Sequence, residues 1–438
     1  PSRQAADRSH SRTSSSKRGG FLRGWTCTSE AHCELGMPAS YKANAMKLNP
    51  DRRKRSLTTA YYLAFIALGM AGAILGPTLP GLAQQTRSHL SEVSFLFTAV
   101  SVGYLAGSLL GGRLYDRVPG NPVMTTGLLI MVSMLALAPF LPQLWLLILA
   151  ITLLGAAQGT VDVGGNTLLV WVHGRSVGPF MNGLHFFWGL GALISPIIVG
   201  QVLLASGEVS WAFWILALLT VPVALWLLRL PSPTAPAEAQ TQSSTAAESA
   251  GDDRTGRARE RSVVLLVTLL LFLFVGAEAG FGGWIYSYPL ALDLGSTATA
   301  EYLTSAYWGA LTFGRLLAIP IASRVRPRWI LLADGCGCLA SIGVLILLPQ
   351  SPLATWVASI GMGLFMASVF PTAITLAERR IPITGRTTGW FLVGASMGGM
   401  TLPMLMGQLF DSVSPQSAMA LLAFYLIAAI ASLLVLVF

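Results

Sequence analysis

Amide and acidic side chains recur at a fixed spacing inside a long apolar stretch. Gln158, Asp162 and Asn166 are each four residues apart, so on a helix they form one polar stripe. A carboxylate in apolar surroundings either carries a proton or lies beside a cation, and exchange between these states can couple an ion gradient to a conformational change. We therefore predict that Asp162 couples an ion and that Gln158 and Asn166 contact a substrate. An interhelical hydrogen bond that only holds the helices together is the alternative.

A second apolar stretch carries an amide, an imidazole and an indole at three-residue intervals, at Asn182, His185 and Trp188. On a helix these side chains lie along neighbouring turns. Amide and imidazole groups can bind hydroxyls, and an indole can pack on the apolar face of a pyranose ring. The pattern therefore favours a sugar as substrate. Packing of the histidine in the helix bundle and placement of the tryptophan at the membrane interface are the alternatives.

Glu278 is the single acidic residue of a third, very apolar stretch, and Trp308, Thr312 and Arg315 share one face of a later helix. Glu278 is a second candidate for ion coupling, and Arg315 is a candidate ion-pair partner and gate residue. We expect Asp162 and Glu278 to be the only two deeply placed carboxylates. Four further aromatic residues are assigned to a belt at the membrane interface rather than to sugar platforms: Trp284, Tyr286, Tyr288 and Tyr307.

The segment GRLYDRV from Gly112 places an acid and a base side by side between two apolar stretches. Asp116 can cap or pair with a neighbouring helix end while Arg117 remains in the interface, which would give a latch that breaks when two groups of helices move apart. An ordinary charged turn that anchors two helices is the alternative.

The composition of the chain indicates that these apolar stretches lie in a lipid membrane. Of the 438 residues, 53% are hydrophobic and only 11% charged, and the mean hydropathy is +0.64. The sequence contains twelve apolar runs of about 20 residues, which is the length that crosses the hydrocarbon core. Each run must be a helix, because only a helix satisfies all backbone hydrogen bonds of a single segment in lipid. They start near Thr59, Glu92, Val123, Leu144, Gly178, Trp211, Val263, Thr299, Trp329, Leu353, Thr387 and Gln416.

The cations lie almost entirely on one side of the predicted membrane. With these twelve spans, 26 of the 28 Lys and Arg residues fall in the loops and tail of one face. Positively charged loops stay in the cytoplasm, so both termini are predicted to be cytoplasmic, in a plasma or bacterial inner membrane. This partition also accounts for the net charge of +9 without nucleic acid as a partner.

Two shifts in composition and one repeat divide the chain. We predict a disordered basic tail at residues 1–56, which begins ahead of possible start sites at Met37 and Met46, a six-helix bundle at 57–229, a cytoplasmic linker at 230–262 and a second bundle at 263–438. GRSVGPFMNG from Gly174 is echoed by GRTTGWFLVG from Gly385. Such a parallel repeat implies a pathway between the halves and a substrate site near the middle of the membrane.

The motifs GRLYDRV and DVGGN, the second from Asp162, carry a resemblance to known proteins. The first resembles the signature loop of the major facilitator superfamily. Segments from Leu75, Leu184, Ala300 and Thr384 are, in order, similar to its branch of fucose, galactose and glucose symporters, and most similar to sodium-dependent glucose transporter-like proteins.

This resemblance implies an all-α membrane protein of two pseudo-symmetric six-helix bundles that moves a monosaccharide with sodium or a proton. DVGGN resembles the motif in which fucose-type members carry a carboxylate in the fourth span. Those members also have an acidic residue in the first span, and Ala73 occupies that position here, which argues against their proton mechanism. An efflux carrier for an amphiphilic compound and a non-transporting membrane sensor are the alternatives.

Phosphate-loop, zinc and catalytic-triad patterns are absent from the sequence, and the four cysteines fit no metal or disulfide pattern. We therefore expect neither an enzyme nor a metal or cofactor, apart from a coupling Na⁺ or H⁺. The expected partners are a small substrate and the lipid bilayer, with the chain acting as a monomer.

Overall fold

The computed structural model describes residues 25–27, 33–35, 50–233, 254–381 and 385–437, in two compact units. The first unit, Pro1–Pro50, contains the antiparallel strands β1 (Trp25–Cys27) and β2 (Cys33–Leu35), which pair Trp25 with Leu35. The sequence did not indicate this strand pair. The other residues of the predicted disordered tail, the two candidate start sites and most of the predicted linker lie outside the described residues.

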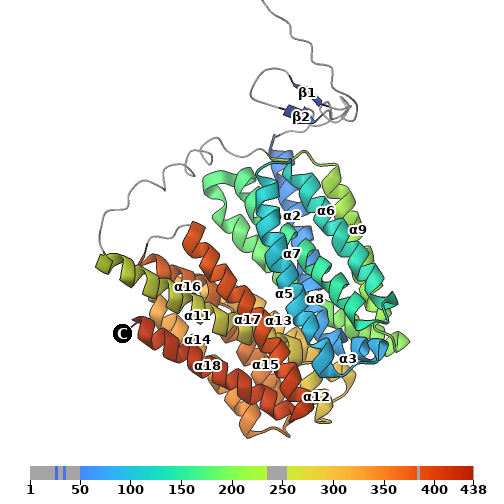
Figure 1. Ribbon diagram of the computed structural model, residues 1–438, viewed down its shortest axis with the longest axis vertical. Coiled ribbons are helices and arrows are strands. Elements are labelled where there is room, and N and C mark those ends of the chain that lie inside the picture. Colours follow the sequence, from blue (N-terminus) through green and yellow to red (C-terminus); the bar gives the residue numbers. More distant parts are fainter. Residues whose placement is uncertain (1–24, 28–32, 36–49, 234–253, 382–384, 438) are drawn as a thin grey trace, which may run out of the picture. The chain divides into compact units, whose positions relative to one another are not determined.

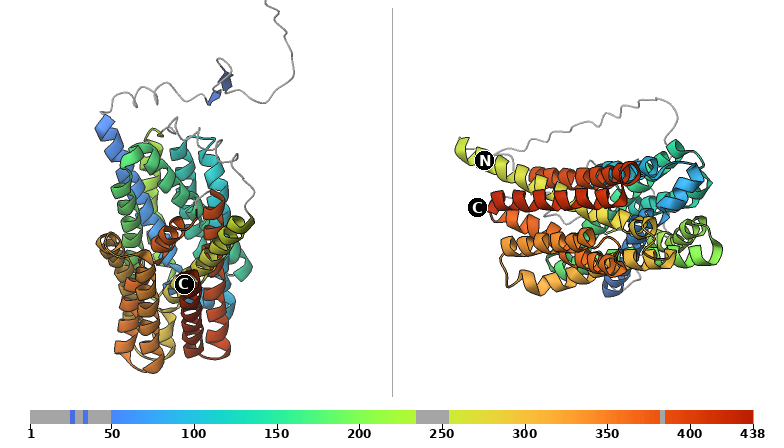
Figure 2. Two further views of the ribbon diagram at one scale, coloured as in Figure 1. Left: turned by 90° about the vertical axis from the view of Figure 1, so that its left-hand side faces the viewer. Right: turned by 90° about the horizontal axis from the view of Figure 1, so that it is seen from below.

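The second unit, Asp51–Phe438, is built from helices, which Figures 1 and 2 show. Its first half consists of α2 (Pro50–Ala73), α3 (Leu75–Thr86), α4 (Leu90–Val93), α5 (Phe95–Tyr115), α6 (Gly120–Leu137), η1 (Ala138–Phe140), α7 (Leu144–His173), η2 (Gly174–Ser176), α8 (Gly178–Ser206) and α9 (Ser210–Leu228). Its second half consists of α11 (Arg254–Trp284), α12 (Ser287–Ala291), α13 (Thr297–Ala322), α14 (Pro327–Leu347), α15 (Pro352–Met366), α16 (Val369–Glu378), α17 (Gly385–Ser412) and α18 (Pro415–Val437).

The helices confirm the twelve predicted membrane spans. Eleven candidate spans in the described part of the chain are long and apolar enough to cross a membrane. The twelfth is α13, which is 26 residues long and carries Glu301 and Arg315. Each predicted start falls within a helix or its first turn, and consecutive short helices such as α4 and α5 together form one span.

Close packing in each half depends on glycine. A Cβ on Gly69 of α2 would lie 1.9 Å from the carbonyl oxygen of Trp188 on α8, and one on Gly398 of α17 would lie 2.0 Å from that of Phe272 on α11. Only glycine permits this approach of two helix backbones. The pairs α2–α8 and α11–α17 thus pack in the same way, and α6 and α9 lie on one side of the unit with α14 and α18 on the other (Figure 1).

Hydrogen bonds between the two halves lie at one end of the helices. Thr98 donates to the carbonyl of Met400, Gln408 donates to that of Ser91, and the Asp411 carboxylate accepts the Ser91 N–H. These residues lie near the start of α5 and the end of α17, far from the Arg-rich loops that follow α5 and α13. We call this end the far end and the end with the Arg-rich loops the basic end.

Candidate functional site

Helices α8 and α13 form a seam between the halves that is closed at the far end. A Cβ on Gly200 would lie 2.6 Å from Cγ of Glu301, and one on Gly189 would lie 2.1 Å from the Thr312 hydroxyl. Next to this contact, the rings of Trp188 and Trp308 meet edge to face, with centroids 5.7 Å apart. The seam therefore extends from the far end to the middle of both helices.

Beyond Trp188 the two helices separate, and this exposes the predicted sugar-binding residues. His185 and Asn182 lie four and seven positions before Gly189, on the face of α8 that contacts α13, and both are exposed. No hydrogen bond of either side chain is found in the described part of the chain. The His185 ring packs edge to face on Phe65 of α2, with centroids 6.1 Å apart. Their polar groups are therefore free to bind a ligand between the halves.

Arg315 connects the two halves at the point where the seam opens. Its Nη2 lies 3.9 Å from Oε1 of Glu278 on α11, and its guanidinium lies 5.4 Å from the ring centroid of Trp188 on α8. Both charged side chains are only partly exposed, at 28% for Arg315 and 20% for Glu278. The predicted ion pair is confirmed, whereas the gate role of Arg315 stays a prediction.

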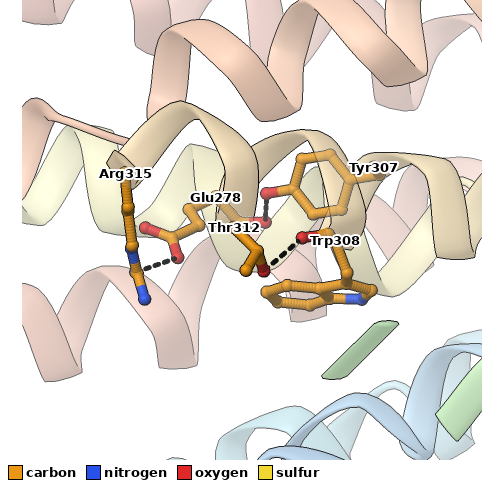
Figure 3. A network of polar contacts seen from close by, with 5 residues as sticks. All are labelled: Glu278, Tyr307, Trp308, Thr312 and Arg315. Carbon is orange, nitrogen blue, oxygen red and sulfur yellow. Dashed lines mark hydrogen bonds and ion pairs between the residues drawn. The ribbon is translucent and has the colours of Figure 1, made fainter. Parts of the chain in front are cut away.

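The surrounding polar groups extend along one side of α13 (Figure 3). Thr312 donates its hydroxyl to the carbonyl of Trp308 at 2.8 Å, and Tyr307 donates to the backbone carbonyl of Glu278 at 2.9 Å. The indole N–H of Trp308 is buried and has no acceptor among the described residues. Because a buried donor without a partner is costly, this N–H is a third unpaired polar group at the seam, after those of Asn182 and His185.

The predicted aromatic belt is wrong. Trp284, Tyr286, Tyr288 and Tyr307 are at most 3% exposed, and Trp284 donates its indole N–H to the carbonyl of Pro403 at 2.8 Å. Side chains of a belt would contact lipid headgroups, whereas these four fill the interior of the bundle. The Trp284 indole and the Tyr307 hydroxyl have backbone acceptors there, which the sequence spacing of aromatic residues does not reveal.

The polar stripe of α7 forms a separate cluster. Tyr104 of α5 donates its hydroxyl to Oδ2 of Asp162 at 2.6 Å, and Asn166 Nδ2 lies 2.9 Å from the carbonyl and 3.3 Å from Oδ1 of Asp162. Gln158 is 4% exposed, and its Nε2 has no acceptor in the described part of the protein. Within the described ranges, no hydrogen bond or ion pair joins this cluster to Glu278. Tyr104 was missed because it lies on another helix.

Two further carboxylates are deeply buried, so the expectation of only two was wrong. Glu301 is 1% exposed, and Asp334 on α14 is 8% exposed and accepts a hydrogen bond from the Ser368 hydroxyl. Glu301 falls two residues after the predicted start of its span, where an acidic residue is usually at the membrane surface. Helical spacing could have revealed the burial of Glu301, because Glu301, Ser305 and Trp308 lie on the same side of α13.

Asp116 and Arg117, the predicted latch residues, end helix α5 at the basic end and are exposed. No side-chain partner of either is found among the described residues. The side chains of residues 385 and 386, at the start of α17, lie outside the described residues. The latch therefore stays a prediction.

Comparisons with known proteins agree with this architecture. Sodium-dependent glucose transporter 1A of Mus musculus is 29% identical over 379 residues, which cover 79% of this chain and 88% of that protein. Sodium-dependent glucose transporter 1 of Rattus norvegicus is 30% identical over 385 residues, covering 80% of this chain and 78% of that protein. A solved structure of a mutant of the nucleoside transporter NupG shares the fold, with a TM-score of 0.71 and 14% identity over 87% of this chain and 100% of that one.

The family model described as "Major Facilitator Superfamily" matches residues 61–391. This match covers most of the chain, from within α2 to the first residues of α17. The protein is therefore a multi-pass membrane transporter that belongs to the Major Facilitator Superfamily.

Proposed function

We propose that this protein carries a monosaccharide across the membrane together with a cation, by alternating access of its two halves. The observation that supports this most is the seam of α8 and α13, which is closed from Gly200 to Trp188 and opens at His185 and Asn182. A site at such a junction faces one side of the membrane at a time, as alternating access requires. Relatives named sodium-dependent glucose transporter favour a sugar and sodium.

The chemistry at this junction suits a pyranose. Trp188 offers a ring face, and the amide of Asn182, the imidazole of His185 and the indole N–H of Trp308 are unpaired groups that can bind hydroxyls. A carrier for amphiphilic compounds would need an aromatic surface with few such groups.

Asp162 is the better of the two candidates for ion coupling. Glu278 already lies beside the guanidinium of Arg315, so its charge is compensated without a bound ion. Asp162 is half-buried, and among the described residues the side chains that donate hydrogen bonds to its carboxylate are neutral, those of Tyr104 and Asn166. A membrane carboxylate without a fixed counter-charge needs a proton or a mobile cation. Sodium or a proton therefore binds at Asp162 in this proposal.

The remaining features of the proposal follow from the charge distribution and the repeat. The basic end and both termini lie in the cytoplasm, in a plasma or bacterial inner membrane. The protein works as a monomer in the bilayer, with bundles at residues 57–229 and 263–438 joined by the linker at 230–262. In this orientation the structure is closed to the outside and its polar seam residues face the cytoplasm.

A panel of labelled monosaccharides, tested in proteoliposomes under separate sodium and proton gradients, examines this proposal. We expect at least one sugar to accumulate against its gradient when one of the two cations is supplied. The matched control is Glu208→Gln, which removes an exposed carboxylate in the loop after α8 and should transport normally. Binding of sugars without accumulation or counterflow in any condition would indicate a sensor instead.

A further inference from the structure

Glu301 is a buried carboxylate between the halves that plays no part in the proposed sugar site. It lies in the second turn of α13, at the far end, and is 1% exposed. Its side chain packs directly on α8, because a Cβ on Gly200 would lie 2.6 Å from its Cγ and 3.4 Å from its carboxyl carbon. Neither carboxyl oxygen has a hydrogen-bond partner among the described residues. In this structure the contact of Glu301 with α8 is part of the closed far end.

Within the part of the chain that the structure describes, no positively charged side chain pairs with this carboxylate. The helices that pack on α13 are α3, α8, α11, α12 and α15. The described parts of α3, α12 and α15 contain no Asp, Glu, Lys, Arg or His. Among these residue types, α8 contributes His185, and the lipid-buried part of α11 contributes Glu278. The phenol of Tyr286, which is 3% exposed, is the nearby titratable group, and as a neutral phenol it offers no counter-charge.

A metal cation is a poor occupant of this place. Hard cations need several oxygen ligands. One turn along α13, the buried hydroxyl of Ser305 also has no partner, but it adds only one oxygen. No group of three His, Cys, Asp or Glu residues that could hold a metal is found in the described ranges.

An ionised carboxylate buried without a donor or a counter-charge is strongly disfavoured, whereas a protonated one is tolerated. We propose that Glu301 is a proton-binding site that closes the far end: it holds a proton while α8 covers it and releases the proton to water when the halves separate. Protons on that side of the membrane then act as a closing ligand.

The sign of the effect follows from this linkage. Because the closed state holds one more proton than the open state, lowering the pH favours closure and raising it favours opening. Linkage of one proton changes the ratio of closed to open molecules by at most about tenfold per pH unit. The proposal depends on alternating access but not on the identity of the sugar or on coupling at Asp162.

Spin labels on the two halves can measure this ratio. In a variant with all four cysteines replaced, cysteines introduced at Glu208 and Gln350 place labels in exposed far-end loops of the first and second halves. Distances are recorded between pH 5 and pH 9 in sodium-free buffer without sugar. We expect the open population to rise with pH, and Glu301→Gln to remain closed throughout. Glu92→Gln, which alters an exposed far-end carboxylate, should keep the pH response.

Distances that do not change with pH in the parent protein would overturn the proposal, and so would an undiminished pH response in Glu301→Gln. A shift caused by sodium at constant pH, lost in Glu301→Gln, would identify a sodium site instead. Infrared spectroscopy gives a second measurement that needs no stable variant. The carbonyl stretch of a protonated buried carboxyl should be present at low pH and should decline as the far end opens.

Discussion

Replacement of Gly189 by Ala should open the far end of the protein. The new Cβ would lie 2.1 Å from Oγ1 and 2.9 Å from Cγ2 of Thr312, which is closer than van der Waals contact allows. Overpacking of this kind costs about 1–3 kcal/mol. The helical preference of alanine acts equally on both states, because α8 stays helical in each, so the cost falls on the closed seam. The ratio of closed to open molecules should decrease roughly 5- to 150-fold.

The same pair of spin labels measures this ratio at constant pH. Thr312→Ala removes both of these atoms and leaves a single contact of 3.0 Å with its Cβ, so it should restore most of the closure in the double variant while changing little by itself. Gly343→Ala is the matched control, since no atom of a neighbouring residue lies within 4 Å of the added carbon. Closure that survives in Gly189→Ala, or that is not restored by Thr312→Ala, would refute the close contact of α8 and α13.

Three further variants probe sugar binding in purified protein. Asn182→Ala or His185→Ala should weaken sugar binding by about 1–3 kcal/mol, because each removes a hydrogen-bonding group. Expression should not fall, because both side chains are exposed and unpaired before the sugar binds. Unchanged affinity in both variants would place the site elsewhere. Trp308→Phe removes an unpaired buried indole N–H and should reduce affinity by about 1 kcal/mol, roughly fivefold, while thermal stability is kept or increased; a loss of stability with normal affinity would show that the indole only packs the seam.

The sequence was sufficient for the features that lipid itself imposes. Twelve helices follow from the thickness of the bilayer and from the need to satisfy the backbone, and the stripe of Asp162 and Asn166 follows from helical spacing. The pairing of Glu278 with Arg315 was predictable because charges are scarce inside the membrane.

Features that depend on how distant helices meet could not be predicted. Tyr104 reaches Asp162 across the contact of α5 and α7, and Glu301 is buried only because α8 presents Gly200 to it. The aromatic residues assigned to a belt are buried for the same reason: the sides of α11, α12 and α13 that face the bundle are set by tertiary packing. Spacing identifies a face of a helix but not the neighbour that covers it.

Coupling at Asp162 is tested most directly by uptake of a labelled monosaccharide into proteoliposomes that contain the parent protein, Asp162→Asn or Glu278→Gln. Asparagine keeps the shape of the side chain and one of its two acceptor oxygens but cannot change its charge. We predict that Asp162→Asn loses accumulation driven by the cation gradient and still exchanges sugar, whereas Glu278→Gln retains gradient-driven uptake. Accumulation that persists in Asp162→Asn would contradict cation coupling at this residue, and its loss in Glu278→Gln alone would assign coupling to α11.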